Sequence, residues 1–187
     1  MARSLGRFAT KDIDMRVADA IFNRLKTETS CVYMVSGGGA MHLVDALGRS
    51  GIFYIAAIHE AGAGFMAIGH AMASNGLGVC LVTSGPGSTN VLTAVAAAWM
   101  DSIPLLVISG QAKSTSLVGD SGRRTVGVQE VDIIPMVEPI TKLAYQAREP
   151  IIAMNMLENM IVLCKEGRPG PCFLSVPLDV QSMAVPE

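Results

Sequence analysis

The chain has 187 residues, 50% of them hydrophobic, and a formal net charge of −2 at pH 7. This length fits one large domain, and the mildly acidic charge argues against nucleic acid, which requires a basic face. The longest apolar run, Val91 to Met100, is too short for a membrane-spanning helix of about 20 residues, and no signal-peptide pattern opens the chain. We therefore expect a cytoplasmic protein with no membrane segment, whose surplus apolar surface contacts another subunit or domain.

The four cysteines, Cys31, Cys80, Cys164 and Cys172, stand singly within apolar runs, and no two of them form a CxxC pair. Zinc sites usually show closely spaced ligand pairs. We therefore expect four reduced thiols in the core and no metal site in this chain, in keeping with a cytoplasmic setting.

The order of the predicted elements indicates a doubly wound α/β domain. Residues 1–13 are expected to be a flexible tail, residues 14–182 the domain, and residues 183–187 the start of a linker. Short apolar runs alternate with helical stretches, which predicts a mostly parallel sheet with helices on both faces. Helices are expected over 14–26, 91–99 and about 150–165, and strands over 31–36, 52–58, 78–83, 105–109 and 171–176. No element is expected after the last strand.

Polar or glycine-rich segments follow four of these strands. They are Ser36–Gly39, His59–Glu60, Thr83–Gly87 and Ser109–Gln111. Ligands bind at the carboxyl ends of the strands in open α/β sheets, so we expect these segments to converge on one edge. The long polar stretch 111–127 is expected to be a loop that is either functional or disordered.

The triple glycine Gly37-Gly38-Gly39 is not a dinucleotide-binding loop, because a GxGxxG frame would place His42 where a small residue must pack. Nor does any GK[ST] segment follow a glycine loop, which excludes a phosphate-binding P-loop. Three glycines after a strand still predict a sharp turn or a close approach of the backbone to a ligand or partner. Both interpretations remain open at this point.

Glu60 is the candidate catalytic residue, since it lies between an apolar strand and a helix rich in alanine and glycine. The helix dipole favours the charged carboxylate by about 0.3–1 kcal/mol, whereas desolvation favours the neutral acid more strongly. No lysine or arginine occurs from residue 50 to residue 112, so burial should dominate if the site is closed. The alternative is a solvated glutamate at a helix end. The role of His59 is left open.

The segment Ser84–Asn90 has a simple structural alternative as well, in which Ser88 or Thr89 caps the following helix. That helix, residues 91–99, is rich in alanine, and small residues let a neighbouring helix approach closely. It is expected to form either a homodimer interface or an ordinary core contact.

Five ordered blocks of this sequence resemble the acetolactate synthase group of thiamine diphosphate enzymes. The blocks are His59-Glu60, Leu81–Asn90, Trp99–Gln111, Val128–Asp132 and Gly167–Pro171. They cover roughly residues 14 to 180 and are similar to the N-terminal, pyrimidine-binding domain of that family. The chain departs from the family pattern at Ala61, where glutamine is usual, and at Ser36, where the turn after the first strand is typically Pro-Gly-Gly.

The resemblance implies that Glu60 hydrogen-bonds ring nitrogen N1′ of the cofactor's aminopyrimidine and helps to activate thiamine diphosphate toward a small 2-oxo acid such as pyruvate. It also implies that Gln129 lies near the substrate channel. The residues implied to shape the pocket around the pyrimidine are Gly37, Gly38, Ser84, Pro86, Gly87 and Asn90.

The family's diphosphate-binding motif, a Gly-Asp-Gly segment that holds Mg²⁺, has only the partial match Gly119-Asp120-Ser121 here. The resemblance therefore implies that the middle and diphosphate-binding domains, with Mg²⁺ and any FAD, belong to another part of the polypeptide or to another subunit. This chain alone would be inactive. The alternatives are the α subunit of a split 2-oxo-acid decarboxylase, and a non-catalytic assembly or regulatory domain of the same fold.

Overall fold

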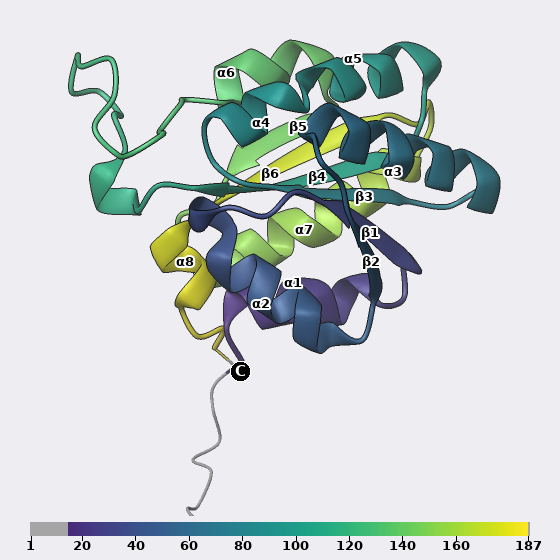
Figure 1. The fold of residues 1–187 in the computed structure, drawn as a ribbon, viewed down its shortest axis with the longest axis horizontal. Helices are drawn as coiled ribbons and strands as arrows, with labels where there is room; N and C mark the ends of the chain where they lie inside the picture. The colour runs from purple at the N-terminus through teal and green to yellow at the C-terminus, as the bar shows by residue number, and fades with distance from the viewer. Residues whose placement is uncertain (1–14, 187) are drawn as a thin grey trace, which may run out of the picture.

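A computed structural model describes residues 15–186, so the flexible tail expected at residues 1–13 lies outside the described residues. Helices and strands alternate along the chain (Figure 1). In order they are α1 (Val17–Leu25), β1 (Cys31–Met34), η1 (Gly38–Ala40), α2 (Met41–Ser50), β2 (Phe53–Ala56), α3 (Glu60–Ser74), β3 (Gly78–Val82), α4 (Pro86–Asn90), α5 (Leu92–Asp101), β4 (Leu105–Gln111), η2 (Ser114–Ser116), α6 (Ile134–Val137), η3 (Glu138–Ile140), β5 (Leu143–Gln146), α7 (Pro150–Lys165), β6 (Pro171–Pro177) and α8 (Leu178–Ser182).

The six strands form one sheet in the order β2-β1-β3-β4-β6-β5, and every neighbouring pair is parallel. Figure 1 shows α3, α4, α5 and α6 on one face, and α1, α2, α7 and α8 on the other. A hydrophobic cluster fills each of the two layers between sheet and helices. The predicted doubly wound α/β fold is confirmed.

The central strands read as continuous apolar runs because both of their faces are covered. Every residue of β3, β4 and β6 is buried. The edge strand β2 differs, since all four of its residues are exposed, including Phe53 at 68%. The exposure of this edge strand was not expected from its apolar residues.

Two short elements correct the sequence prediction. β5 was not expected; its four residues are only half-buried at the opposite edge of the sheet, so it lacks the long apolar run of a central strand. α8 follows β6 directly, in a stretch where no further element was expected. It is five residues long, with Val180 and Gln181 buried against the rest of the domain.

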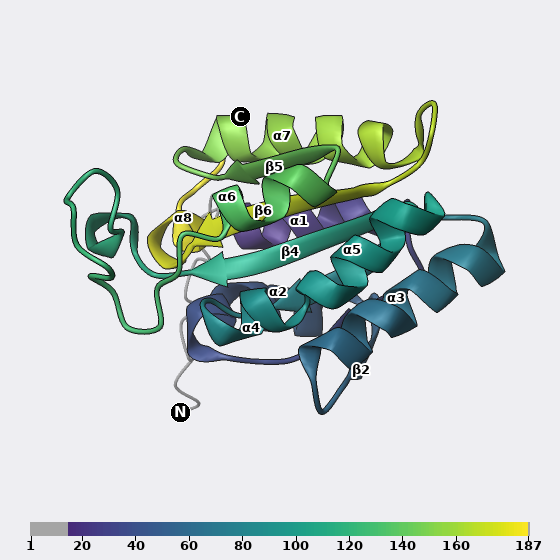
Figure 2. The same ribbon diagram turned by 90° about the horizontal axis from the view of Figure 1, so that it is seen from above.

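The small residues of α3 and α5 let these two helices pack closely within the chain. Figure 2 shows them side by side on one face of the molecule. A Cβ added at Gly64 would lie 2.5 Å from the Cβ of Ala94. Ala94, Val95 and Ala98 are buried, so this part of the alanine-rich helix has an ordinary core role.

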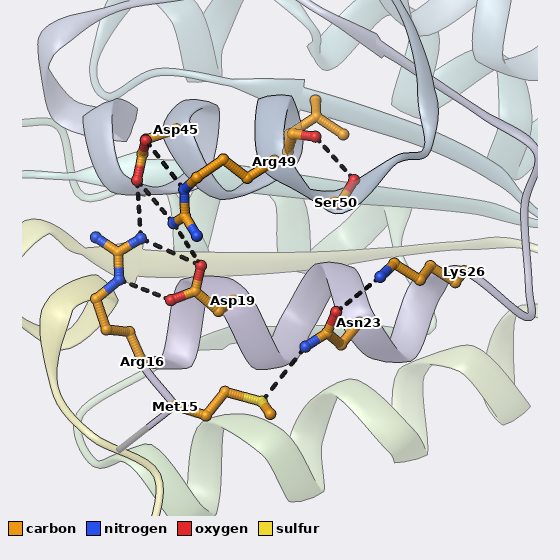
Figure 3. Close-up of polar contacts among 9 residues, drawn as sticks. Met15, Arg16, Asp19, Asn23, Lys26, Asp45, Arg49 and Ser50 are labelled. Atoms are coloured by element: carbon orange, nitrogen blue, oxygen red, sulfur yellow. Dashed lines mark hydrogen bonds and ion pairs between the residues drawn. The ribbon is translucent and has the colours of Figure 1, made fainter. Parts of the chain in front are cut away.

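An ion-pair network joins α1 to α2 on the other face of the sheet (Figure 3). Arg16 contacts Asp19 at 2.7 Å and Asp45 at 2.8 Å, and Arg49 contacts the same two carboxylates at 2.7 and 2.9 Å. Hydrogen bonds from Arg16 hold the pKa of Asp19 below its ordinary value, and those from Arg49 do the same for the pKa of Asp45. The network fixes the first two helices relative to each other.

The beginning and end of the described chain lie together. Arg16 forms an antiparallel bridge with Ala184, and the amide of Val17 donates to the carbonyl of Met183 at 2.9 Å. All four cysteines are free and buried, as expected. Within residues 15–186 no helix is long and apolar enough to cross a membrane.

Candidate active site

The order of the strands places the candidate site at a switch point of the sheet. The chain passes from β1 outward to β2 and then returns to the opposite side of β1 as β3. Because connections leave in opposite directions at such a point, a crevice opens between the turns that follow β1 and β3. These turns are Gly37–Gly39 and Thr83–Gly87, the two glycine-rich segments singled out in the sequence.

Glu60 is the first residue of α3 and is only 9% exposed. Its Oε2 accepts a hydrogen bond from Nδ2 of Asn90 at 3.0 Å. A Cβ added at Gly87 would lie 3.5 Å from the other oxygen, Oε1. Glu60, Gly87 and Asn90 therefore come together from the ends of two different strands, as the sequence predicted.

The neighbouring His59 has a structural role. It is the N-cap of α3, and its Nδ1 accepts a hydrogen bond from the amide of Ala61 at 3.2 Å. The imidazole therefore satisfies one of the free amides in the first helical turn. The sequence left the role of His59 open, and the structure shows it as a helix cap.

The surroundings of Glu60 are apolar and carry no compensating cation. No ion pair joins this carboxyl to any residue between 15 and 186. The thiol of Cys80, on β3, is completely buried; burial first, and then the charge of Glu60, raise the pKa of Cys80. The carboxyl group thus lies against the sheet core, where charge is weakly screened.

The turn after β1 packs directly on the turn after β3, and glycine is required for this contact. A Cβ at Gly37 would lie 2.5 Å from Cβ of Thr83, and a Cβ at Gly39 would lie 2.4 Å from Oγ of Ser84. Gly110, near the end of β4, also packs closely on the first turn. A Cβ added at Gly110 would lie 2.2 Å from the carbonyl oxygen of Gly39. The expected convergence of these segments on one edge is confirmed.

Ser88 and Thr89 do not cap a helix. Gly85 precedes α4, which begins at Pro86. The hydroxyl of Ser88 donates to the carbonyl of Thr83 at 2.8 Å and also contacts the hydroxyl of Ser109. Ser88 therefore ties α4 to the ends of β3 and β4.

Gln181 supports the first glycine turn from α8 and is fully buried. Its Nε2 donates to the carbonyl of Gly39 at 2.7 Å and to the carbonyl of Val176 at 2.9 Å. No sequence pattern indicates this residue, because 142 positions separate it from Gly39 and it stands in a polar stretch near the end of the chain.

The long loop after β4 extends beyond the edge of the sheet (Figure 2). Glu130, 6% exposed, organises it. The carboxylate accepts hydrogen bonds from the amides of Val126 at 2.8 Å, Gly127 at 3.2 Å and Val118. Burial raises the pKa of Glu130, but these amide hydrogen bonds outweigh that effect and hold it below its ordinary value.

Gln129 precedes this carboxylate and lies against the turn after β3. Its backbone is left-handed, with φ of 55°. A Cβ added at Gly85 would lie 2.0 Å from the carbonyl oxygen of Gln129. Gly85 itself has φ of 57°, so both the conformation and the contact require glycine there.

A cavity of about 290 Å³ opens between the loop and the two glycine turns. Gly38, Ser84 and Gln129 belong to its lining, which brings these three predicted residues together. Glu60, Gly87 and Asn90 form a separate group outside that lining, and Pro86 is exposed at the start of α4. The complete lining is Gly38, Gly39, Ser84, Gln111, Ala112, Lys113, Ser116, Gly127, Val128, Gln129 and Leu178.

The group best placed for chemistry in this site is the carboxyl group of Glu60, which has a hydrogen bond at only one of its two oxygens. Asn90 engages Oε2, while no residue of the described chain donates a hydrogen bond to Oε1. A nearly buried carboxyl oxygen with a free lone pair can share a proton with a ring nitrogen. Gly87 is required by its close contact with Thr83, since an added Cβ would lie 2.8 Å from Cγ2 of that residue. Among residues 15–186, no group of three or more His, Cys, Asp or Glu side chains could hold a metal ion.

Comparison with known proteins identifies the family. Residues 15–136 match the family described as "Thiamine pyrophosphate enzyme, N-terminal TPP binding domain". The chain belongs to this family. Glu60 and the two glycine turns lie within the matched residues. The resemblance noted in the sequence is confirmed.

Several relatives of this TPP-binding domain are large subunits of acetolactate synthases. The chain is 40% identical over 157 residues to the acetolactate synthase large subunit of Lactococcus lactis, which covers 83% of this chain and 26% of that protein. It is 36% identical over 168 residues to the probable large subunit of Methanocaldococcus jannaschii, covering 89% and 27%. It is 40% identical over 149 residues to the acetolactate synthase isozyme 1 large subunit of Escherichia coli, a match that covers 79% of this chain and 25% of that protein. The chain spans about a quarter of these relatives.

Proposed function

We propose that this domain supplies the proton-transferring glutamate of a thiamine diphosphate-dependent enzyme that acts on pyruvate or a related 2-oxo acid, in the manner of an acetolactate synthase. One observation carries the proposal. Glu60 is nearly buried at the switch point of the sheet, with Oε2 held by Asn90 and Oε1 without a hydrogen bond from the described residues. A carboxyl group placed in this way can exchange a proton with a basic ring nitrogen.

The residues of this chain would bind and orient the pyrimidine half of the cofactor. Glu60 would share a proton between Oε1 and ring nitrogen N1′, while Asn90 keeps the carboxyl group in place. When bound, thiamine diphosphate would supply a carbon nucleophile for the carbonyl of the 2-oxo acid and an electron sink for its decarboxylation. The apolar surroundings of Glu60 strengthen its interaction with the ring nitrogen.

The remaining predicted residues take supporting roles in this proposal. Gly87 lies beside Glu60, and Gln129 lines the adjoining cavity, where the substrate would enter. The other residues proposed to shape the pocket are Gly37, Gly38, Ser84 and Pro86.

The diphosphate half of the cofactor and Mg²⁺ would be held elsewhere. The chain spans about a quarter of its relatives, which supports a domain of a larger enzyme whose middle and diphosphate-binding domains lie outside this sequence, with residues 183–187 starting the linker. FAD, if the enzyme uses it, would bind there too. A split decarboxylase, with this chain as the α subunit, would place the same residues in the same roles. We expect the domain alone to be inactive and the enzyme to be cytoplasmic.

A second copy of the chain is the proposed partner on the face formed by α3 and α5. Although their small residues pack together within the chain, the outer sides of these helices carry several exposed apolar residues. Apolar groups gathered on adjacent helices favour association. They are Phe65, Met66, Met72, Trp99 and Met100.

The test is the Glu60→Gln variant of the assembled enzyme, compared with Glu138→Gln as a matched control. Glu138 is likewise the first residue of a helix, the short η3, but it is exposed. Glu60→Gln should abolish proton exchange at C2 of the bound cofactor, measured by hydrogen–deuterium exchange, and should leave the circular dichroism spectrum unchanged. Normal exchange in Glu60→Gln would refute the proposal and favour a non-catalytic assembly domain.

A further inference from the structure

The cavity between the long loop and the glycine turns contains a single charge. Lys113 is the only charged residue in its lining, and the other lining groups are backbone, hydroxyl, amide or aliphatic. No ion pair engages Lys113 within residues 15–186. The cavity is therefore suited to an anion, and a single positive charge matches a monoanion best.

The lining also offers a hydroxyl group without a hydrogen-bond partner among the described residues. Ser84 is 3% exposed. Its Oγ is directed at Gly39, where an added Cβ would lie 2.4 Å away. No described residue forms a hydrogen bond with this hydroxyl. This hydroxyl is therefore free to donate a hydrogen bond to an oxygen atom of a ligand.

The size of the cavity suits a small anion. A water molecule occupies about 30 Å³ of liquid volume. A cavity of about 290 Å³ therefore has room for an acid of the size of pyruvate together with a few waters.

We infer that Lys113 recognises the carboxylate of the 2-oxo acid and that Ser84 donates a hydrogen bond to the same ligand. This inference rests on the proposed function and makes Lys113 the residue that selects an acid over an uncharged ketone. Lys113 pairs with the carboxylate in the cavity. Glu60, beside Gly87 and Asn90 and outside the cavity lining, acts on the cofactor. The cofactor's diphosphate is the other anion that could reach Lys113, so the test separates the two.

The experiment compares Lys113→Met, Lys113→Arg and Arg124→Met in the assembled enzyme. Arg124 is an exposed cation on the same loop and does not line the cavity. Its variant therefore controls for the general loss of one positive charge from the loop. Three quantities are measured: the KM for pyruvate, the Kd for thiamine diphosphate, and the inhibition constant of 2,3-butanedione, an uncharged analogue of pyruvate. Pyruvate binding is also measured by calorimetry in a Glu60→Gln background, where turnover does not interfere.

Lys113→Met should weaken pyruvate binding about tenfold, in both KM and calorimetric Kd, because it removes a hydrogen bond to a charged group. The Kd for thiamine diphosphate and the inhibition constant of 2,3-butanedione should stay the same. Lys113→Arg should restore pyruvate binding to within about threefold, since the charge is retained. Arg124→Met should behave like the wild-type enzyme.

Several results would overturn the inference: equal pyruvate affinity in Lys113→Met and the wild type, equal losses in Lys113→Met and Arg124→Met, or a change confined to thiamine diphosphate. The last result would assign Lys113 to the cofactor. Normal proton exchange at C2 in these same variants would show that only this inference, and not the role of Glu60, has failed. Because Lys113 is exposed, its replacement should leave the melting temperature unchanged.

Discussion

Asn90 donates a hydrogen bond of 3.0 Å to Oε2 of Glu60, although 30 residues separate the two positions. Asn90 ends α4, just after β3, while Glu60 begins α3, just after β2. The amide group leaves Oε1 free and fixes the plane of the carboxyl group. A freely rotating carboxyl group would have to be ordered each time a ligand binds, which costs conformational entropy.

Replacement of Asn90 by alanine should slow proton exchange at C2 of the bound cofactor about tenfold in the assembled enzyme. The variant loses a hydrogen bond to a carboxyl group, which is worth about 1.5–3 kcal/mol when that group is charged. Asn90 is exposed, so the fold should persist. Thr93→Ala, an exposed position on α5, is the control. Equal exchange rates in the two variants would show that Glu60 does not depend on Asn90.

Gly64 and Gly69 on α3 form a matched pair for testing the close packing of α3 against α5. Alanine at Gly64 would place its Cβ 2.5 Å from the Cβ of Ala94, whereas nothing lies within 4 Å of a Cβ at Gly69. Alanine favours the helix by about 1 kcal/mol at both positions, and overpacking costs about 1–3 kcal/mol at Gly64 alone. Urea denaturation should find Gly64→Ala less stable than Gly69→Ala by about 2 kcal/mol. Equal stabilities would contradict the observed packing.

The long loop should lose its order at acid pH through Glu130. Its pKa in the folded protein is below the ordinary value of 4.5, because amide hydrogen bonds outweigh the effect of burial. The stabilisation is therefore complete above about pH 4.5 and is lost as the pH falls through the lowered pKa. NMR of the amide protons of Val126 and Gly127 between pH 7 and pH 3 should follow this transition.

Glu130→Gln is the control for that titration. Its loop amides should show no transition in the same pH range, since the titrating group is absent. At neutral pH trypsin should cut this variant faster at Arg123 and Arg124, both exposed on the loop. A transition identical to that of the wild type would mean that another group orders the loop.

Association of two chains should depend on the exposed apolar side of α3 and α5. Phe65→Asp introduces a charge on this face, where Phe65 is 47% exposed. Ile151→Asp is the matched control, because Ile151 is 53% exposed but lies on α7, across the sheet. Analytical ultracentrifugation should find a monomer for Phe65→Asp and a dimer for the wild type and Ile151→Asp. A dimer in all three would place the interface elsewhere.

The fold was predictable from the sequence wherever burial was complete. Strands β3, β4 and β6 are buried at every position, so their residues form the continuous apolar runs that mark a parallel sheet. β5 escaped notice because an edge strand mixes polar and apolar residues, as in Leu143–Gln146. The exposure of β2 could not be inferred either, since its apolar residues resemble those of a covered strand.

The candidate site was predictable as far as strand order determines it. Segments at the carboxyl ends of parallel strands must meet at one edge, which is why Glu60 and the Thr83–Gly87 turn could be expected near each other, whereas Asn90 was expected there from the family resemblance. Gln181 and Glu130 were missed as supporting residues. Their roles depend on hydrogen bonds to particular backbone groups across the fold, at Gly39 and around Val126. No local pattern in the sequence records such a contact.

The bridge between Arg16 and Ala184 has a consequence for protein engineering. Because the two ends of the domain are adjacent, a short peptide could join them and new termini could be opened in the exposed loop near Arg123. Such a circular permutant should keep the same sheet order. For the same reason the domain could be inserted as a module between two residues of a host protein, entering and leaving at nearly one point.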